Sequence, residues 1–190
     1  MFQTLKPYAV AALVLSAGAS YAQDTSAPEV NMGSTEGPAV GQVYQAETIG
    51  DWDLRCLKTE GGDDPCQMYQ LLTDETGQAV AEVNLFPMPE EHPAAAAATV
   101  MVPLMTLLAE GISITVDDGQ TRRYPIEFCG PEGCISRMGF TDEDLAAFKA
   151  GSVAKVRIVQ AEVSEGAEVM LDMSLSGFTR SFEQADPPTE

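Results

Sequence analysis

Short runs in which apolar and polar residues alternate, bounded by turn residues, dominate the sequence from about residue 48 onward. The clearest run covers residues 112–116, and the Asp118-Gly119 pair after it is a strong hairpin turn. A period of two residues is typical of a strand with one buried face. Further strands are expected over residues 49–57, 66–72, 79–86, 99–102, 122–129, 153–163 and 168–175, with a final short segment over 178–182.

One segment has the pattern of a helix. Thr141 is a good N-cap residue, Asp144 completes a capping box three residues later, and Gly151 is a stop signal. The alanine run at residues 94–98 stands between a proline and two β-branched residues, so we expect it to lead into a strand. Many short strands with one short helix, and no strand–helix alternation, predict an all-β fold, either a two-sheet sandwich or a small barrel.

A run of large apolar residues follows the alanines. It could form a sticky surface, but flexible methionines commonly fill irregular gaps in cores, and we expect core packing here. The residues concerned are Met101, Leu104, Met105, Leu107 and Leu108.

The four cysteines form two close pairs in the sequence. Nine residues separate Cys56 from Cys66, and four separate Cys129 from Cys134. Four cysteines allow three pairings, and the turns inside each pair favour two local disulfides, Cys56–Cys66 and Cys129–Cys134. Neither pair has the C-x-x-C spacing of thiol–disulfide exchange, and a zinc site is also disfavoured.

The first 22 residues have the features of a cleaved signal peptide. Lys6 precedes an apolar run over residues 9–19, and small residues precede a cut after Ala22. The apolar run is too short to span a bilayer, which takes about 20 residues. We therefore expect a signal peptide (1–22), a flexible acidic tail (23–47), a folded domain (48–183) and a disordered C-terminus (184–190). The mature chain is expected to be periplasmic or secreted, with no transmembrane segment.

The charge balance restricts the possible partners. The chain has 29 acidic and 10 basic residues, a net charge of −19, and the predicted cleavage removes only the basic Lys6. Such a molecule repels nucleic-acid phosphates and anionic lipid headgroups, which excludes nucleic acid as a partner.

No set of catalytic, cofactor-binding or metal-ligating residues can be singled out. The one histidine, His92, lies in a proline-rich loop, where it is a poor candidate for activating a nucleophile. The aspartates at 63, 64, 117 and 118 lie in turns, where aspartate bonds its own backbone; a weak calcium site there stays open. Paired carboxylates that hydrolyse an envelope substrate remain the alternative to a non-enzymatic function.

Three residues are predicted to have structural roles. Trp52 lies on the same strand face as Cys56, so we expect it in the core beside the first disulfide. Gly177 interrupts a strand pattern, which predicts a bulge, and the bulge would point Phe178 into the core.

Five blocks of the sequence together resemble the invasion-associated locus B family, which comprises exported proteins of Gram-negative bacteria. The blocks are Gly50-Asp51-Trp52 with Cys56, Cys66-x-Met68-x-Gln70, residues 103–117, residues 129–134 and Ser174-Leu175-Ser176-Gly177-Phe178. The resemblance implies an immunoglobulin-like β-sandwich at the cell envelope, linked to host-cell invasion, with no catalytic residues. We therefore expect a non-enzymatic module that binds an unidentified protein or envelope component. The expected contacts are a sandwich edge strand or the loop at residues 57–65.

Overall fold

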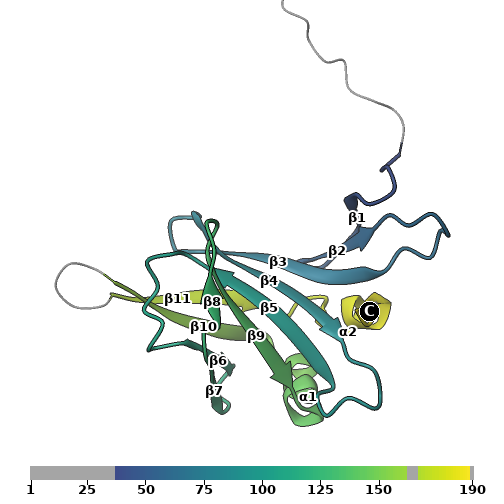
Figure 1. Ribbon diagram of the computed structural model, residues 1–190. Coiled ribbons are helices and arrows are strands. Elements are labelled where there is room, and N and C mark those ends of the chain that lie inside the picture. Colours follow the sequence, from purple (N-terminus) through teal and green to yellow (C-terminus); the bar gives the residue numbers. More distant parts are fainter. Residues whose placement is uncertain (1–36, 162–166, 189–190) are drawn as a thin grey trace, which may run out of the picture. The chain divides into compact units, whose positions relative to one another are not determined.

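The computed structural model describes residues 37–161 and 167–188. The expected signal peptide and residues 23–36 of the expected tail lie outside the described residues. Within the described part the strands form two antiparallel sheets (Figure 1). The structure is therefore an all-β sandwich, with the two local disulfides that the sequence predicts, Cys56–Cys66 and Cys129–Cys134.

The larger sheet has seven strands in the order β1-β2-β3-β4-β5-β9-β8. Its first five strands form a meander, because each pairs with the next in the chain. The strands are β1 (Val43–Ile49), β2 (Trp52–Leu57), β3 (Cys66–Thr73), β4 (Ala79–Pro87), β5 (Ala96–Val102), β8 (Phe128–Cys129) and β9 (Cys134–Phe140). The alanine run thus leads into a strand, as predicted.

The smaller sheet has four strands in the order β11-β10-β6-β7. They are β6 (Ile112–Val116), β7 (Thr121–Tyr124), β10 (Val153–Gln160) and β11 (Ala167–Ser174). The single strand predicted over residues 122–129 is wrong, because β7 and β8 belong to different sheets. Pro125 lies between them and has no N–H to donate to a ladder, while its carbonyl accepts from Ser136 Oγ at 2.8 Å.

The described residues contain two helices rather than the one predicted. Helix α1 (Asp142–Ala150) has the expected capping box between Thr141 and Asp144 and ends at Gly151. Helix α2 (Phe178–Gln184) replaces the expected final strand segment. The two helices contact each other at one end of the sandwich (Figure 1).

Both ends of the domain extend further than the composition predicted. Strand β1 begins at Val43, inside the expected tail, because its polar residues pair with β2 rather than filling the core. At the C-terminus, the backbone N–H of Asp186 donates to the Cys66 carbonyl at 2.8 Å, and the Asp186 carboxylate accepts from the Cys66 N–H at 3.0 Å. Residues 43–47 and 184–186 are therefore part of the fold, contrary to the expected boundaries.

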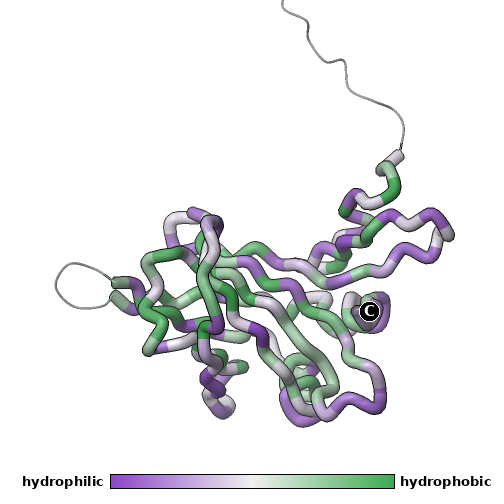
Figure 2. Tube along the Cα trace, viewed as in Figure 1, coloured by the Kyte–Doolittle hydropathy of each residue, from purple (hydrophilic) through white to green (hydrophobic). Residues whose placement is uncertain are grey.

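The core lies between the two sheets. Strand β5 alternates strictly between buried and half-buried residues, and Figure 2 shows it as a largely hydrophobic strand next to hydrophilic hairpin turns. A chain of aromatic contacts also runs through the core beneath both helices. Ring centroids lie 5.0–5.8 Å apart along the series Trp52, Phe178, Phe148, Phe140 and Tyr124.

Candidate functional site

Gly177 makes a close backbone contact instead of the predicted bulge. It follows the end of β11 and caps α2 with φ +83°, a left-handed conformation that favours glycine. A Cβ at this position would overlap the Ile49 carbonyl, and one at Gly50 would overlap the Ser176 carbonyl. Phe178 is 1 % exposed, so it lies in the core, but the helix start rather than a bulge places it there.

Gln70 connects the two sheets beside this contact. Its side-chain amide donates to the carbonyls of Asp51 and Ser174 at 3.0 and 3.1 Å, and its oxygen accepts from the Ser174 N–H at 2.8 Å. Trp52, fully buried, donates its indole N–H to the same Ser174 carbonyl at 2.9 Å. We call these residues, together with Gly50 and Gly177, the junction. Its polar groups bond to each other, which makes it a structural region rather than a site.

The loop at residues 57–65, bounded by the first disulfide, is also held by its own polar groups. Asp64 accepts hydrogen bonds from the Thr59 N–H at 2.8 Å, Lys58 at 3.0 Å and the Tyr44 hydroxyl at 2.8 Å. These donors, the Thr59 N–H first, hold the pKa of Asp64 far below its usual range. The Asp64 carboxylate is therefore occupied by hydrogen bonds that hold the loop in place.

The edge strands differ in how open they are to a partner. Strand β1 has an irregular register between Gln45 and Glu47, β7 has four residues and β8 has two. Strand β11 has eight residues in unbroken register with β10. Bulges and short strands protect sheet edges, and β11 has neither protection.

The outward-facing backbone groups of β11 can be identified from Ser174. Its N–H and carbonyl bond to Gln70 and Trp52, away from β10. Backbone groups alternate in direction along an antiparallel strand, so those of Glu168, Met170 and Asp172 also point outward. No described residue forms a backbone hydrogen bond with these three outward groups.

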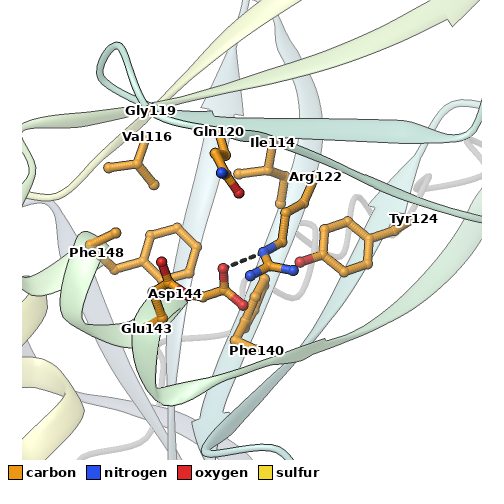
Figure 3. A pocket seen from close by; sticks show the side chains of 11 residues that line it. Ile114, Val116, Gly119, Gln120, Arg122, Tyr124, Phe140, Glu143, Asp144 and Phe148 are labelled. Carbon is orange, nitrogen blue, oxygen red and sulfur yellow. Dashed lines mark hydrogen bonds and ion pairs between the residues drawn. The ribbon is translucent and has the colours of Figure 1, made fainter.

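A slot lies between the β6–β7 hairpin and α1, at the Tyr124 end of the series of aromatic contacts (Figure 3). Its volume is about 240 Å³. Its lining combines apolar residues with polar and charged ones. We call the apolar and aromatic lining residues the walls (Ile114, Val116, Tyr124, Phe140, Ala147 and Phe148) and the others the rim (Gly119, Gln120, Arg122, Glu143 and Asp144).

The rim contains one ion pair. Arg122 donates Nε–H to the Asp144 carboxylate, which also accepts from the backbone N–H of Thr141 at 2.9 Å and from its hydroxyl at 2.8 Å. Burial, reinforced by the Asp144 charge, raises the pKa of Tyr124 to about 12. The side chain of Glu143, in the first turn of α1, forms no hydrogen bond or ion pair with another described residue. Although two acids line the slot, Asp144 is occupied by structural donors and is a poor partner for paired-carboxylate hydrolysis.

The other candidates from the sequence are not part of a site. Asp117 does not bond its own turn as expected; it accepts from the backbone N–H groups of Ser152 and Val153, at the start of β10. His92 bonds its own loop at Ala94. Residues 37–161 and 167–188 contain no group of three or more His, Cys, Asp or Glu side chains able to hold a metal ion.

Three of the large residues expected in the core are exposed instead. Leu104, Met105 and Leu108 are between 53 % and 62 % exposed. Their segment is held to β10 through its backbone, because Leu107 N–H donates to the Val159 carbonyl at 2.7 Å, and this leaves their side chains outside. The expectation of core packing is wrong for these three residues.

None of the helices in the described part of the chain is long and apolar enough to cross a membrane.

Comparison with known proteins identifies a family and a fold. The model of the invasion associated locus B (IalB) protein family matches residues 52–186. An invasion protein B homolog of Brucella abortus strain 2308 is 25% identical over 145 residues, which cover 76% of this chain and 80% of the relative; a homolog from biovar 1, strain 9-941, matches equally. The crystal structure of invasion associated protein B from Bartonella henselae matches with a TM-score of 0.59 and 21% identity, over 73% of this chain and 93% of that one. This last similarity concerns the fold alone.

Proposed function

Because the chain belongs to the invasion-associated locus B family, we propose that it is an exported, non-enzymatic protein of the cell envelope that binds a partner protein along the edge of β11. The observation that carries the proposal is the row of outward backbone groups at Glu168, Met170 and Asp172 in an unbroken strand. An extended peptide can add to such an edge by main-chain hydrogen bonds, without a dedicated sequence motif. Binding at a strand edge therefore requires neither a catalytic site nor a recognition motif in the sequence.

The side chains of β11 define the chemistry of the partner. Met170 is 48 % exposed, and it stands between Glu168 and Asp172, which pair with Arg157 and Lys155 of β10. If a second copy added symmetrically about Met170, Glu168 of one copy would lie opposite Asp172 of the other. Like charges directly opposite each other are destabilising, and each copy has a net charge of −19. We therefore propose a different protein as the partner, with an extended segment in which basic residues flank an apolar one.

Two substitutions at Met170 test this mode of binding. Met170→Pro removes an outward N–H and leaves the bonds to β10 in place, whereas Met170→Ala removes the side chain and keeps the N–H. In affinity capture from envelope extract, followed by mass spectrometry, Met170→Ala is expected to retain the partner and Met170→Pro to lose it. The same partner captured by the proline variant at wild-type yield and Tm would overturn the proposal.

Hydrogen exchange gives a second readout if the proline variant does not fold. In the wild-type protein, the amides of Glu168, Met170 and Asp172 are expected to exchange fast when free and slowly in the complex. Unchanged exchange at all three amides in a saturated complex would place the partner elsewhere. Exclusive capture of a second copy would replace the proposed partner with a dimer.

Export is supported by the disulfides and by the relatives. All four cysteines are paired, which fits an oxidising, extracytoplasmic compartment. We expect the secreted or periplasmic fraction to contain a chain that begins at Gln23, as determined by N-terminal sequencing. A chain that retains residue 1 and stays in the cytoplasm would contradict this part of the proposal.

A further inference from the structure

We infer that the slot between the β6–β7 hairpin and α1 binds a small amine that carries an aromatic or branched apolar group. The inference is independent of the binding proposed at β11, since no residue of β11 lines the slot. In Figure 3 the Arg122–Asp144 ion pair lies between the rings of Phe148, Phe140 and Tyr124.

The size and walls of the slot limit the apolar part of the ligand. Its volume of about 240 Å³ is below the roughly 300–1,000 Å³ typical of sites for larger ligands. Phe140 and Phe148 are each 2 % exposed, and their rings meet edge to face, 5.0 Å apart. These two rings are fixed by the core, so the slot is a rigid apolar recess that fits one ring or one branched chain.

The charged residues at the rim of the slot determine which polar group the ligand carries. Arg122 and Asp144 neutralise each other, and Asp144 is further occupied by Thr141. The Glu143 carboxylate is then the unbalanced charge beside the recess, with no partner among the described residues. An ammonium group bonded to Glu143, with its apolar group in the recess, supplies the missing counter-charge.

The charge of the whole chain favours a cation over an anion. The net charge of −19 raises the local concentration of cations and repels carboxylates. Arg122 is bonded to Asp144 through Nε–H, and an anion bound to its other N–H groups would lie beside the carboxylates of Asp144 and Glu143, which would repel it.

Three probes of similar size distinguish the sign of the charge. In titrations followed by NMR chemical shifts at pH 7, phenethylamine is expected to shift amides of residues 119–124 and 140–148. Phenylalanine, which adds a carboxylate, is expected to bind more weakly, and 3-phenylpropionate is expected not to bind. Preferential binding of 3-phenylpropionate would overturn the inference and assign the slot to acids through Arg122.

A matched pair of variants tests the role of Glu143. Glu143→Gln and Asp142→Asn remove one charge each from the first turn of α1, but only Glu143 lines the slot. An exposed ion pair contributes up to about 1 kcal/mol, so Glu143→Gln should weaken phenethylamine binding by up to about fivefold relative to Asp142→Asn. Equal affinities in the two variants would show that Glu143 does not hold the amine.

Ala147→Leu provides a steric test. Ala147 lines the slot and is itself exposed, so the longer side chain of leucine would fill part of the slot without disturbing the core. We expect the variant to fold with an unchanged Tm and to lose phenethylamine binding. Undiminished binding in the folded variant would place the amine outside the slot.

Discussion

The series of aromatic contacts that runs from Trp52 to Tyr124 ends in two regions with different polar surroundings. At the Trp52 end, Gln70 and Ser174 bond to each other and two glycine backbones are in contact, so the polar groups of the junction are occupied by one another. At the Tyr124 end, the same core opens into a slot with an unpaired carboxylate at its rim. Three of the five blocks that resemble the family, those with Trp52, Gln70 and Gly177, lie at the junction, whereas the block at residues 103–117 reaches the slot. The comparison indicates that the blocks at the junction specify the fold.

The largest expected effect is at Gly177. Gly177→Val combines a left-handed backbone, which costs about 1–3 kcal/mol for a residue with a Cβ, with overlap of the Ile49 carbonyl. We expect little or no folded protein, as measured by circular dichroism. Gly77→Val is the control, because Gly77 has the same φ of +83° but open space around it. Equal stability of the two variants would show that the close contact at Gly177 is unimportant.

The next largest effect is expected at Trp52. Its ring is fully buried and meets Phe178 edge to face at 5.6 Å, so Trp52→Ala should lower the free energy of unfolding by about 3–5 kcal/mol. Trp52→Phe keeps an aromatic ring and loses only part of the volume and the bond to Ser174, so its loss should be clearly smaller. Urea unfolding measures both, and similar losses would mean that the hydrogen bond matters more than the packing.

Gln70→Leu tests the bonds that link the sheets. The change leaves the half-buried Ser174 N–H without its acceptor, which should cost about 1–2 kcal/mol. Gln67→Leu, on the same strand, is the control, because Gln67 forms no such bridge. Equal urea midpoints for the two variants would contradict the role of Gln70 in closing the junction.

The smallest effect concerns Tyr124 at the open end. Its pKa is raised to about 12 in the folded protein, against about 10 for a free tyrosine. The folded state therefore retains the phenol proton more strongly than the unfolded state, and stability falls as pH rises from 10 to 12. Because the ring is only half buried, we expect a loss on the order of 1 kcal/mol, which Tyr124→Phe should lack. Parallel pH profiles of unfolding for the two proteins would show that Tyr124 is not buried as described.

The success of each sequence prediction depended on how local its physical cause is. Helix α1 was predictable because Thr141 and Asp144, three residues apart, cap it. Helix α2 was not, because Gly177 caps it without any side-chain hydrogen bond. Strand β1 buries only Ile49, so little in its sequence indicates a core strand, and its pairing with β2 makes it a strand.

The same distinction applies to the candidate sites. Both disulfides close short loops and were predictable from spacing. The slot depends on Arg122 meeting Asp144 across 22 positions of sequence, and no local pattern indicates such a pair. The exposure of Leu104, Met105 and Leu108 was likewise set by long-range backbone bonds to β10, against their hydrophobicity.

Native-state hydrogen exchange, resolved residue by residue with NMR, tests the contrast between the two ends most directly. The Asp51 amide donates to the Ser176 carbonyl and the Ser174 amide to Gln70, so both should exchange only through global unfolding. The amides of Leu145 and Gly151 in and after α1, beside the slot, should exchange through local opening at a lower free energy. Protection that is equal at the two ends, or lower at the junction than beside the slot, would contradict the account.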